Sequence, residues 1–187
     1  KDATLSLMSE DEVIRSDTSL EMLSSLKPVF DSEPKNTLSQ KNIEMTLDVM
    51  ANSLIYWAQD LYQWGLLKKG SQIFGMTSSG GHRQWRTYGA VSMAKAALES
   101  AIRQLAVELA PHKIAANSIQ AGVTDTEALR KIPGSENMIK DIINSNPNKR
   151  LTLPEDVGKA VANIGLSDDT WMTGNVIRLD GGEDITS

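Results

Sequence analysis

A tyrosine and a lysine stand seven positions apart in the stretch "TYGAVSMAK", which runs from Thr87 to Lys95. If this stretch is helical, seven steps of about 100° return Tyr88 and Lys95 to within roughly 20° of one face. The residues between them are mostly small, so a ligand can approach that face closely. Since a phenol beside an ammonium group donates a proton more readily, the pair predicts acid catalysis. The spacing alone also fits a surface tyrosine and lysine on an amphipathic helix.

Polar loops follow each of the expected strands. The run 71–79, "SQIFGMTSS", has the composition of a buried strand that ends in a polar loop, and Ser78 comes ten positions before Tyr88. A second strand, "KIAANSIQA", precedes the loop "GVTDT" at 122–126, and the last strand lies within "NVIRLDGG". Open α/β sheets bind ligands at the carboxyl edge of their strands, which favours a functional site there.

Helices are expected between these strands. Within 42–65, apolar residues recur at steps of three and four, which predicts a helix with one buried face (Ile43, Leu47, Met50, Leu54, Trp57 and Leu61). Further helices are expected over 88–110, around 136–144 and from Pro154, with Thr152 or Leu153 near the cap of the last. The alternation predicts an α/β fold: a doubly wound, Rossmann-like parallel sheet with helices on both faces.

The acidic charge is concentrated at the start of the chain. Eight acidic and three basic residues fall in 1–33, whereas the other 154 residues hold sixteen of each sign. Nucleic-acid binding needs a clustered basic surface, so nucleic acid is not an expected partner. We expect 1–40 to be a poorly organised acidic segment and 41–187 to be part of a single domain.

The composition excludes several kinds of site. The chain has no cysteine, so disulfides and a cysteine nucleophile are excluded, and a reducing, cytoplasmic location is expected. His82 and His112 are the only histidines, so no metal site is expected. No apolar run approaches the roughly 18 to 20 residues of a membrane span.

Five motifs, taken in chain order, resemble the carboxyl-terminal two-thirds of a short-chain dehydrogenase/reductase. They are the strand before Ser78, the tyrosine and lysine, "LAVELAPHKIAANSIQAGVTDT", "RLTLPEDVGKAV" and "TGNVIRLDGG", within residues 42–184. Most members have the tyrosine four positions before the lysine, where this chain has Val91. Tyrosine, six residues and lysine is the arrangement of the enoyl-acyl carrier protein reductase branch.

The resemblance implies a reductase of enoyl thioesters in fatty acid biosynthesis that uses NADH or NADPH. Tyr88 would bond the carbonyl oxygen of the substrate, and Lys95 would hold the ribose hydroxyls of the nicotinamide nucleotide. The loop against the nicotinamide ring would be Gly122, Val123 and Thr124. Thr126 would contact the cofactor, and Thr77 would lie beside it. Thr126 could instead cap the segment that follows it.

Two departures from the enoyl branch leave alternatives open. Ser78 stands where that branch often has an aromatic residue, and Asn52 resembles the helix asparagine of ketoreductases. Both are compatible with a 3-oxoacyl or other carbonyl reductase in which Ser78 shares the oxygen contact. Ser78 could instead bond only its own loop, and Asn52 could be a helix-surface amide. A non-catalytic binding or oligomerisation module is the alternative from another class.

The amino-terminal half of the family's fold has no counterpart in this chain. That half begins with a strand and a glycine-rich turn against the cofactor pyrophosphate, whereas none of the 13 glycines precedes Gly65. We therefore expect the chain to be part of a longer protein and to bind dinucleotide poorly by itself. The residues that select NADH or NADPH lie in the absent half.

The resemblance also indicates partners. The substrate would be an acyl thioester on acyl carrier protein or coenzyme A. The segment 128–150 matches the family's mobile substrate cover, in which apolar residues could line an acyl tunnel or pack as core (Met138, Ile139, Ile142 and Ile143). Basic residues of this region could meet an acidic carrier or simply be solvated (Arg130, Lys131, Lys140, Lys149 and Arg150). The alanine-rich helix 88–110 predicts a homodimer or homotetramer, and the tryptophans at 57, 64 and 85 are expected in core and loop packing.

Overall fold

A computed structural model describes residues 27, 29, 37–130 and 135–186 of the protein. Most of the acidic segment 1–40 lies outside the described residues, as does the 131–134 part of the expected substrate cover. The boundary between the acidic segment and the domain therefore stays a prediction.

Three parallel strands form the sheet, in the order β1-β2-β3, and all three were expected from the sequence. They are β1 (Gln72–Thr77), β2 (Ala115–Ala121) and β3 (Val176–Leu179). Thr77 pairs with Gln120, which in turn pairs with Arg178, so all three strands end at the same edge. The loops that carry the candidate site residues leave from this edge.

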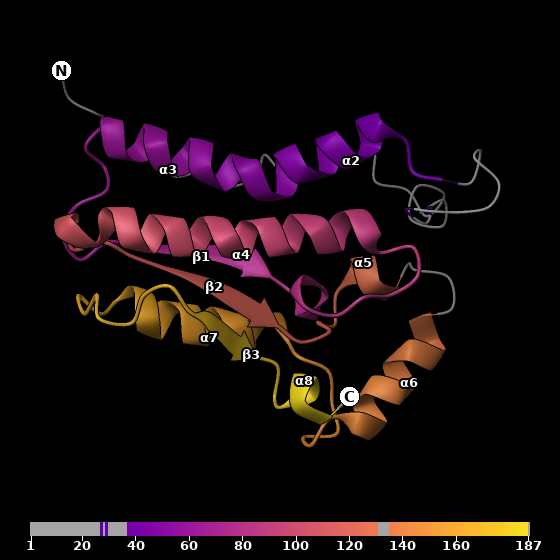
Figure 1. Cartoon of the computed structure of the whole chain (residues 1–187). Helices are drawn as coiled ribbons and strands as arrows, with labels where there is room; N and C mark the ends of the chain where they lie inside the picture. Colours follow the sequence, from indigo (N-terminus) through magenta and orange to yellow (C-terminus); the bar gives the residue numbers. More distant parts are fainter. Residues whose placement is uncertain (1–26, 28, 30–36, 131–134, 187) are drawn as a thin grey trace.

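Helices cover both faces of the sheet, which confirms the predicted fold class (Figure 1). On one face α4 (Gly89–Leu109) packs on β1 and β2, and a Cβ at Gly75 would lie 2.9 Å from Leu98. The outer layer over α4 consists of α2 (Gln40–Leu47) and α3 (Ser53–Gln63). The opposite face holds α7 (Pro154–Gly165), whose Gly165 lies against Phe74.

A π-helical segment, η2 (Asp48–Asn52), joins α2 to α3 and changes which residues face the core. The expected helix over 42–65 is present, but Trp57 is 62% exposed and the buried residues are Ala51 and Ala58. A π turn has one residue more than an α turn, so the face that follows it is rotated relative to a continuous α-helix. The expectation that Trp57 packs in the core was therefore wrong; Trp64 and Trp85 are also exposed.

Four short elements complete the fold around the carboxyl edge of the sheet. They are η3 (Ser79–Gly81), α5 (Glu127–Arg130), α6 (Ser135–Ser145) and α8 (Glu183–Thr186); η4 (Ala110–His112) follows α4 at its far end. Of these, α6 matches the helix expected around 136–144. The sequence indicates neither α5 nor α8, because four residues are too few to show a helical period.

The alanines of α4 lie mainly inside the chain. Ala90, Ala94 and Ala106 are at most 6% exposed, so the expected alanine-rich contact surface is only partly present. Small residues at these positions instead let α4 approach the sheet and η2 closely. The large apolar side chains of α4 that are exposed are Met93 and Val107.

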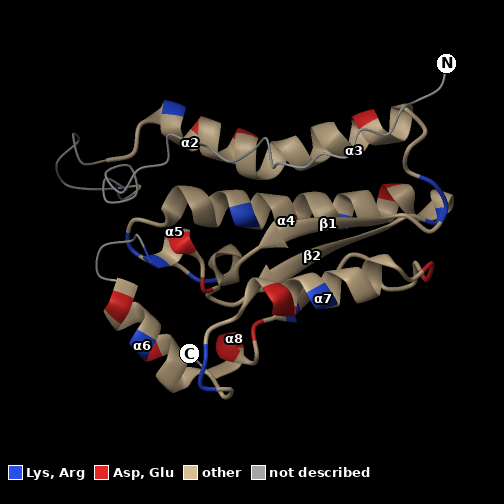
Figure 2. Ribbon diagram, turned by 180° about the vertical axis from the view of Figure 1, so that it is seen from behind, with Lys and Arg blue, Asp and Glu red and all other residues tan. Residues whose placement is uncertain are grey.

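Charged residues are spread over the elements. Figure 2 shows both acidic and basic positions on α2, α4, α6 and α7, whereas α8 carries acidic positions only. That nucleic acid is not a partner stays a prediction from the sequence. No helix in the described part of the chain is long and apolar enough to cross a membrane.

Candidate active site

Tyr88 occupies the N-cap position of α4 and lies over the loop that follows β1. A Cβ at Gly80 would lie 2.5 Å from Cε1 of the Tyr88 ring, so only glycine permits this approach without a shift of the ring. Trp85 packs against the ring in a T-shaped arrangement, at a centroid distance of 5.7 Å and an interplanar angle of 85°. Tyr88 is thus half-buried and held on two sides by the 79–86 loop.

Lys95 reaches the end of β1 from the second turn of α4. Its Nζ donates a hydrogen bond of 2.8 Å to the backbone oxygen of Met76. Burial lowers the pKa of Lys95 below its ordinary value, and the Glu99 carboxylate one turn later partly offsets this effect. Lys95 therefore contacts the carboxyl end of β1, and Tyr88 lies over the loop that leaves it.

Glu99 is a partner of Thr77 and Lys95 that the sequence analysis did not identify. The Oγ1 of Thr77, a residue only 5% exposed, donates a 2.6 Å hydrogen bond to Glu99 Oε1. A Cβ at Gly81 would lie 2.3 Å from the same oxygen. The four-residue step from Lys95 to Glu99 is a signal that could have been found, because such residues lie side by side on a helix.

The hydroxyls of Ser78 and Thr126 both cap short helices. Ser78 Oγ accepts a 3.3 Å hydrogen bond from the Gly80 N–H, and Thr126 Oγ1 accepts one of 3.2 Å from the Leu129 N–H. Bonding within its own loop was the structural alternative considered for Ser78, and capping of the following segment was the one considered for Thr126. Their contacts with a substrate or cofactor stay predictions.

The loop after β2 leaves the same edge of the sheet as the loop after β1, and Glu183 and Thr152 contact it. The Val123 N–H donates to both carboxylate oxygens of Glu183, at 3.1 and 3.2 Å, and Thr124 Oγ1 donates to the Gly122 oxygen at 2.9 Å. A Cβ at Gly122 would lie 2.6 Å from Thr152 Oγ1, so this glycine is required by close packing. The structure thus brings Gly122, Val123 and Thr124 to the same edge as Thr77 and Ser78.

Asn52 falls within η2 and is exposed. Its amide donates a 3.4 Å hydrogen bond to Asp48 on its own helix. The structure therefore favours the helix-surface interpretation of Asn52 over a role in the site.

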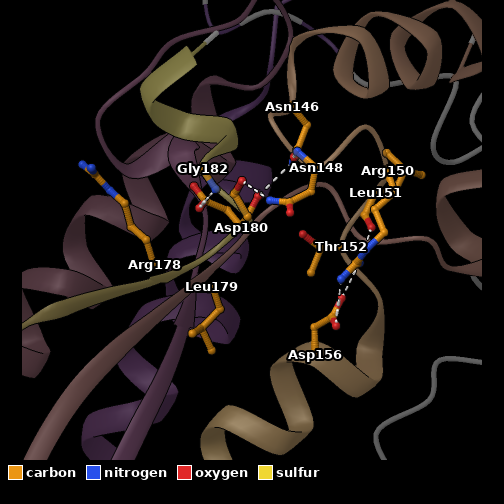
Figure 3. Close-up of a pocket in the computed structure, with 11 residues that line it drawn as sticks. Asn146, Asn148, Arg150, Leu151, Thr152, Asp156, Arg178, Leu179, Asp180 and Gly182 are labelled. Carbon is orange, nitrogen blue, oxygen red and sulfur yellow. Dashed lines mark hydrogen bonds and ion pairs between the residues drawn. The ribbon is translucent and has the colours of Figure 1, made fainter.

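Two cavities lie near the carboxyl edge of the sheet. A cavity of about 330 Å³ is lined by Asp125, Ile139 and Ile143 among others, so it opens between the 122–126 loop and α6. A polar cavity of about 440 Å³ lies beside the turn after β3, where Asp180 and Asn146 contribute to its wall (Figure 3). Neither Tyr88 nor Lys95 lines them.

The side chains fit the nicotinamide end of a dinucleotide better than a metal ion. In the described residues no group of three or more metal-ligating side chains occurs. A primary ammonium and a phenol at the carboxyl edge of parallel strands are donors for hydroxyl and carbonyl oxygens. The glycine-free first 64 residues offer no pyrophosphate loop, so the fit concerns the nicotinamide end only.

The parallel sheet with this tyrosine and lysine at its edge defines a short-chain dehydrogenase/reductase. The model of the enoyl-(acyl carrier protein) reductase family matches residues 23–183. The chain therefore belongs to that family.

Individual relatives agree with this assignment. The NADH-dependent enoyl-[acyl-carrier-protein] reductase FabI of Bacillus subtilis is 31% identical over 122 residues, which cover 65% of this chain and 47% of FabI. The chain thus spans about half the length of the curated relatives it matches.

Solved structures show the same fold. The Bacillus cereus enoyl-acyl carrier protein reductase with NADP⁺ and indole naphthyridinone has a TM-score of 0.75 and 28% identity, covering 88% of this chain and 62% of that one. The promiscuous reductase LugOII, which catalyses a keto-reduction in lugdunomycin biosynthesis, has a TM-score of 0.70 and 26% identity, covering 86% and 62%.

Proposed function

We propose that the intact protein is an NADH- or NADPH-dependent reductase of enoyl thioesters in fatty acid biosynthesis. The observation that carries the proposal is the position of Tyr88 and Lys95, seven positions apart in sequence: Lys95 bonds the Met76 oxygen of β1, and Tyr88 packs on Gly80 in the loop that follows β1. Membership of the enoyl-(acyl carrier protein) reductase family supports the same reaction.

Each residue then has a chemical role. Tyr88 donates a hydrogen bond to the thioester carbonyl oxygen, which becomes negatively charged as hydride reaches the β-carbon. Lys95 turns from the Met76 oxygen to the ribose hydroxyls of the nucleotide. Gly122, Val123 and Thr124 form the wall beside the nicotinamide ring, with Thr77, Ser78 and Thr126 around it. When bound, the nucleotide would supply the hydride, and the enolate would then take a proton from water at the α-carbon.

The acyl chain has a candidate position next to this wall. Ile139 and Ile143 of α6 line the cavity of about 330 Å³ together with Asp125 of the 122–126 loop. None of the four apolar residues of α6 is fully buried, so the tunnel interpretation is better supported than core packing. The chain would be carried by acyl carrier protein or coenzyme A.

The substrate class is tested by comparing two thioesters with the full-length protein. We expect crotonyl thioester to be reduced with a higher kcat/KM than acetoacetyl thioester. The rival is a 3-oxoacyl or carbonyl reductase, which serine at position 78 and the similarity to the keto-reducing LugOII support. A large preference for acetoacetyl thioester that is lost in Ser78→Ala would replace the enoyl assignment with this rival.

A non-catalytic module is the rival from another class. Titration of the full-length protein with NADH and NADPH separates the two classes. Binding of either nucleotide supports the reductase, whereas failure of both to bind supports the module.

We also propose that the protein forms a homodimer or homotetramer through α4 and the helices next to it. Large apolar side chains are exposed on these helices, including Tyr56, Trp57 and Val107 at 51%, 62% and 72% exposure. A second copy would remove them from water. Sedimentation should show an oligomer at micromolar concentration, and a stable monomer would contradict the proposal. A cytoplasmic location stays a prediction from the absence of cysteine.

A further inference from the structure

The last described helix, α8, is fixed at the carboxyl edge of the sheet by its own turn. Asp180 Oδ1 accepts from the Gly182 N–H at 2.9 Å, and its Oδ2 accepts from the Asp184 N–H at 3.0 Å. Asn146 donates to the Asp180 oxygen at 3.0 Å, as Figure 3 shows, and Asn148 to the Gly181 oxygen at 2.8 Å. The start of α8 therefore has a defined position relative to β3.

Asp184 extends from α8 to the loop after β1. Its carboxylate, 4% exposed, contacts His82 Nε2 at 3.1 Å, Arg83 Nε at 3.2 Å and Arg178 Nε at 3.2 Å. The Arg83 guanidinium also donates to the Asp184 backbone oxygen. Burial acts to raise the pKa of Asp184, but a hydrogen bond from Gln120 and the charges of His82 and Arg83 leave the pKa below its ordinary value. The carboxylate is thus ionised and held by the loop.

The loop that Asp184 holds is the one that packs on Tyr88. Gly80 lies against the Tyr88 ring, two residues before His82. The Ser92 hydroxyl of α4 donates to the Arg83 oxygen at 3.3 Å. A shift of the loop at His82 and Arg83 would therefore move the support of the tyrosine ring.

Glu183 extends from α8 to the other loop of the site. Its carboxylate accepts the Val123 N–H and lies 2.9 Å from where a Cβ on Gly122 would be. Burial raises the pKa of Glu183, and the bond from Val123 only partly offsets this. Neighbouring residues of a helix point about 100° apart, which is why two adjacent carboxylates reach two different loops.

We propose that Glu183 and Asp184 are positioning residues of the active site: Asp184 sets the loop behind Tyr88, and Glu183 sets the loop beside the nicotinamide. The two assignments rest on the proposed function for their kinetic consequence, whereas the loop contacts themselves do not. The contacts above join Asp184 to the loop after β1 and Glu183 to the loop after β2, so both residues act through the loops.

The first test is amide hydrogen exchange of the full-length protein, which needs no turnover. Asp184→Asn keeps the shape of the side chain and removes its charge, so we expect faster exchange in 79–88. Arg83→Gln, which changes only the loop side, should give the same increase. The matched control is Asp156→Asn, which removes the Arg150 ion pair of 2.6 Å at the start of α7. Unchanged exchange in 79–88 for both Asp184→Asn and Arg83→Gln would overturn the proposal.

The second test is the division of the effects between kcat and KM. With crotonyl thioester, Asp184→Asn should lower kcat about tenfold to a hundredfold with little change in the KM for dinucleotide. Glu183→Ala should raise that KM, and Glu183→Gln, which keeps an acceptor for Val123, should restore it. Because a smaller folded fraction would also lower the apparent kcat without changing KM, each rate is normalised to the folded fraction measured by thermal unfolding. An unchanged normalised kcat for Asp184→Asn, or an unchanged KM for Glu183→Ala, would contradict the assignment. If the wild type reduces no thioester, the proposed function fails and the exchange experiment still decides the role of the loops.

Discussion

Tyr88→Phe in the full-length protein is expected to lower kcat for crotonyl thioester by about a hundredfold to a thousandfold. The substitution removes one hydroxyl, which in the proposed mechanism is the donor to the oxygen that gains negative charge. Loss of a single donor of this kind costs about that factor in other enzymes. The ring is kept, so its packing on Gly80 and Trp85 should persist. Thermal unfolding should therefore stay close to that of the wild type.

The matched control is Tyr62→Phe. Tyr62 bonds His112 through its hydroxyl, at 3.1 Å to Nε2, at the end of α4 opposite Tyr88. Loss of that hydroxyl should leave kcat unchanged. Equal rates for Tyr88→Phe and the wild type would remove Tyr88 from the mechanism, whatever reaction the protein catalyses.

Lys95→Met is expected to raise the KM for the dinucleotide about tenfold to a hundredfold. Hydrogen bonds from a charged donor are worth about 1.5–3 kcal/mol, and each 1.4 kcal/mol corresponds to a factor of ten. The value of kcat should fall as well, because the positive charge beside the phenol is lost. The measurement is initial rate against dinucleotide concentration, with Lys41→Met on exposed α2 as the control. An unchanged KM would contradict the contact with the ribose.

The difference in the free energy of unfolding between Lys95→Met and the wild type should depend on pH, because Lys95 is partly buried. Because burial lowers the pKa of Lys95, the charged form is disfavoured in the folded state. Below that lowered pKa the wild type bears the full cost, and the cost disappears as the pH rises to 10.5, the ordinary value. The free energy of unfolding of the wild type should therefore rise relative to that of Lys95→Met as the pH increases towards 10.5. Any stability advantage of Lys95→Met should shrink in alkaline solution, as denaturant titrations at several pH values would show.

Much of the fold could be predicted from the sequence because the relevant signals are local. The strands β1, β2 and β3 are short apolar runs bounded by polar or glycine-containing loops. Helix geometry alone predicts that Tyr88 and Lys95 share one face of their helix. The acidic bias of 1–33, the lack of cysteine and the lack of early glycine needed no coordinates either.

Other features depend on contacts between distant residues, and these only the tertiary structure decided. The π turn at η2 exposes Trp57 and buries Ala58, although the sequence period places Trp57 inside. Glu183 and Asp184 follow a glycine pair as two ordinary acids, yet one contacts Val123 and the other contacts His82, 102 positions away. Periodicity fixes which face of an element is apolar, whereas the partner of a polar group depends on how the finished elements pack against one another.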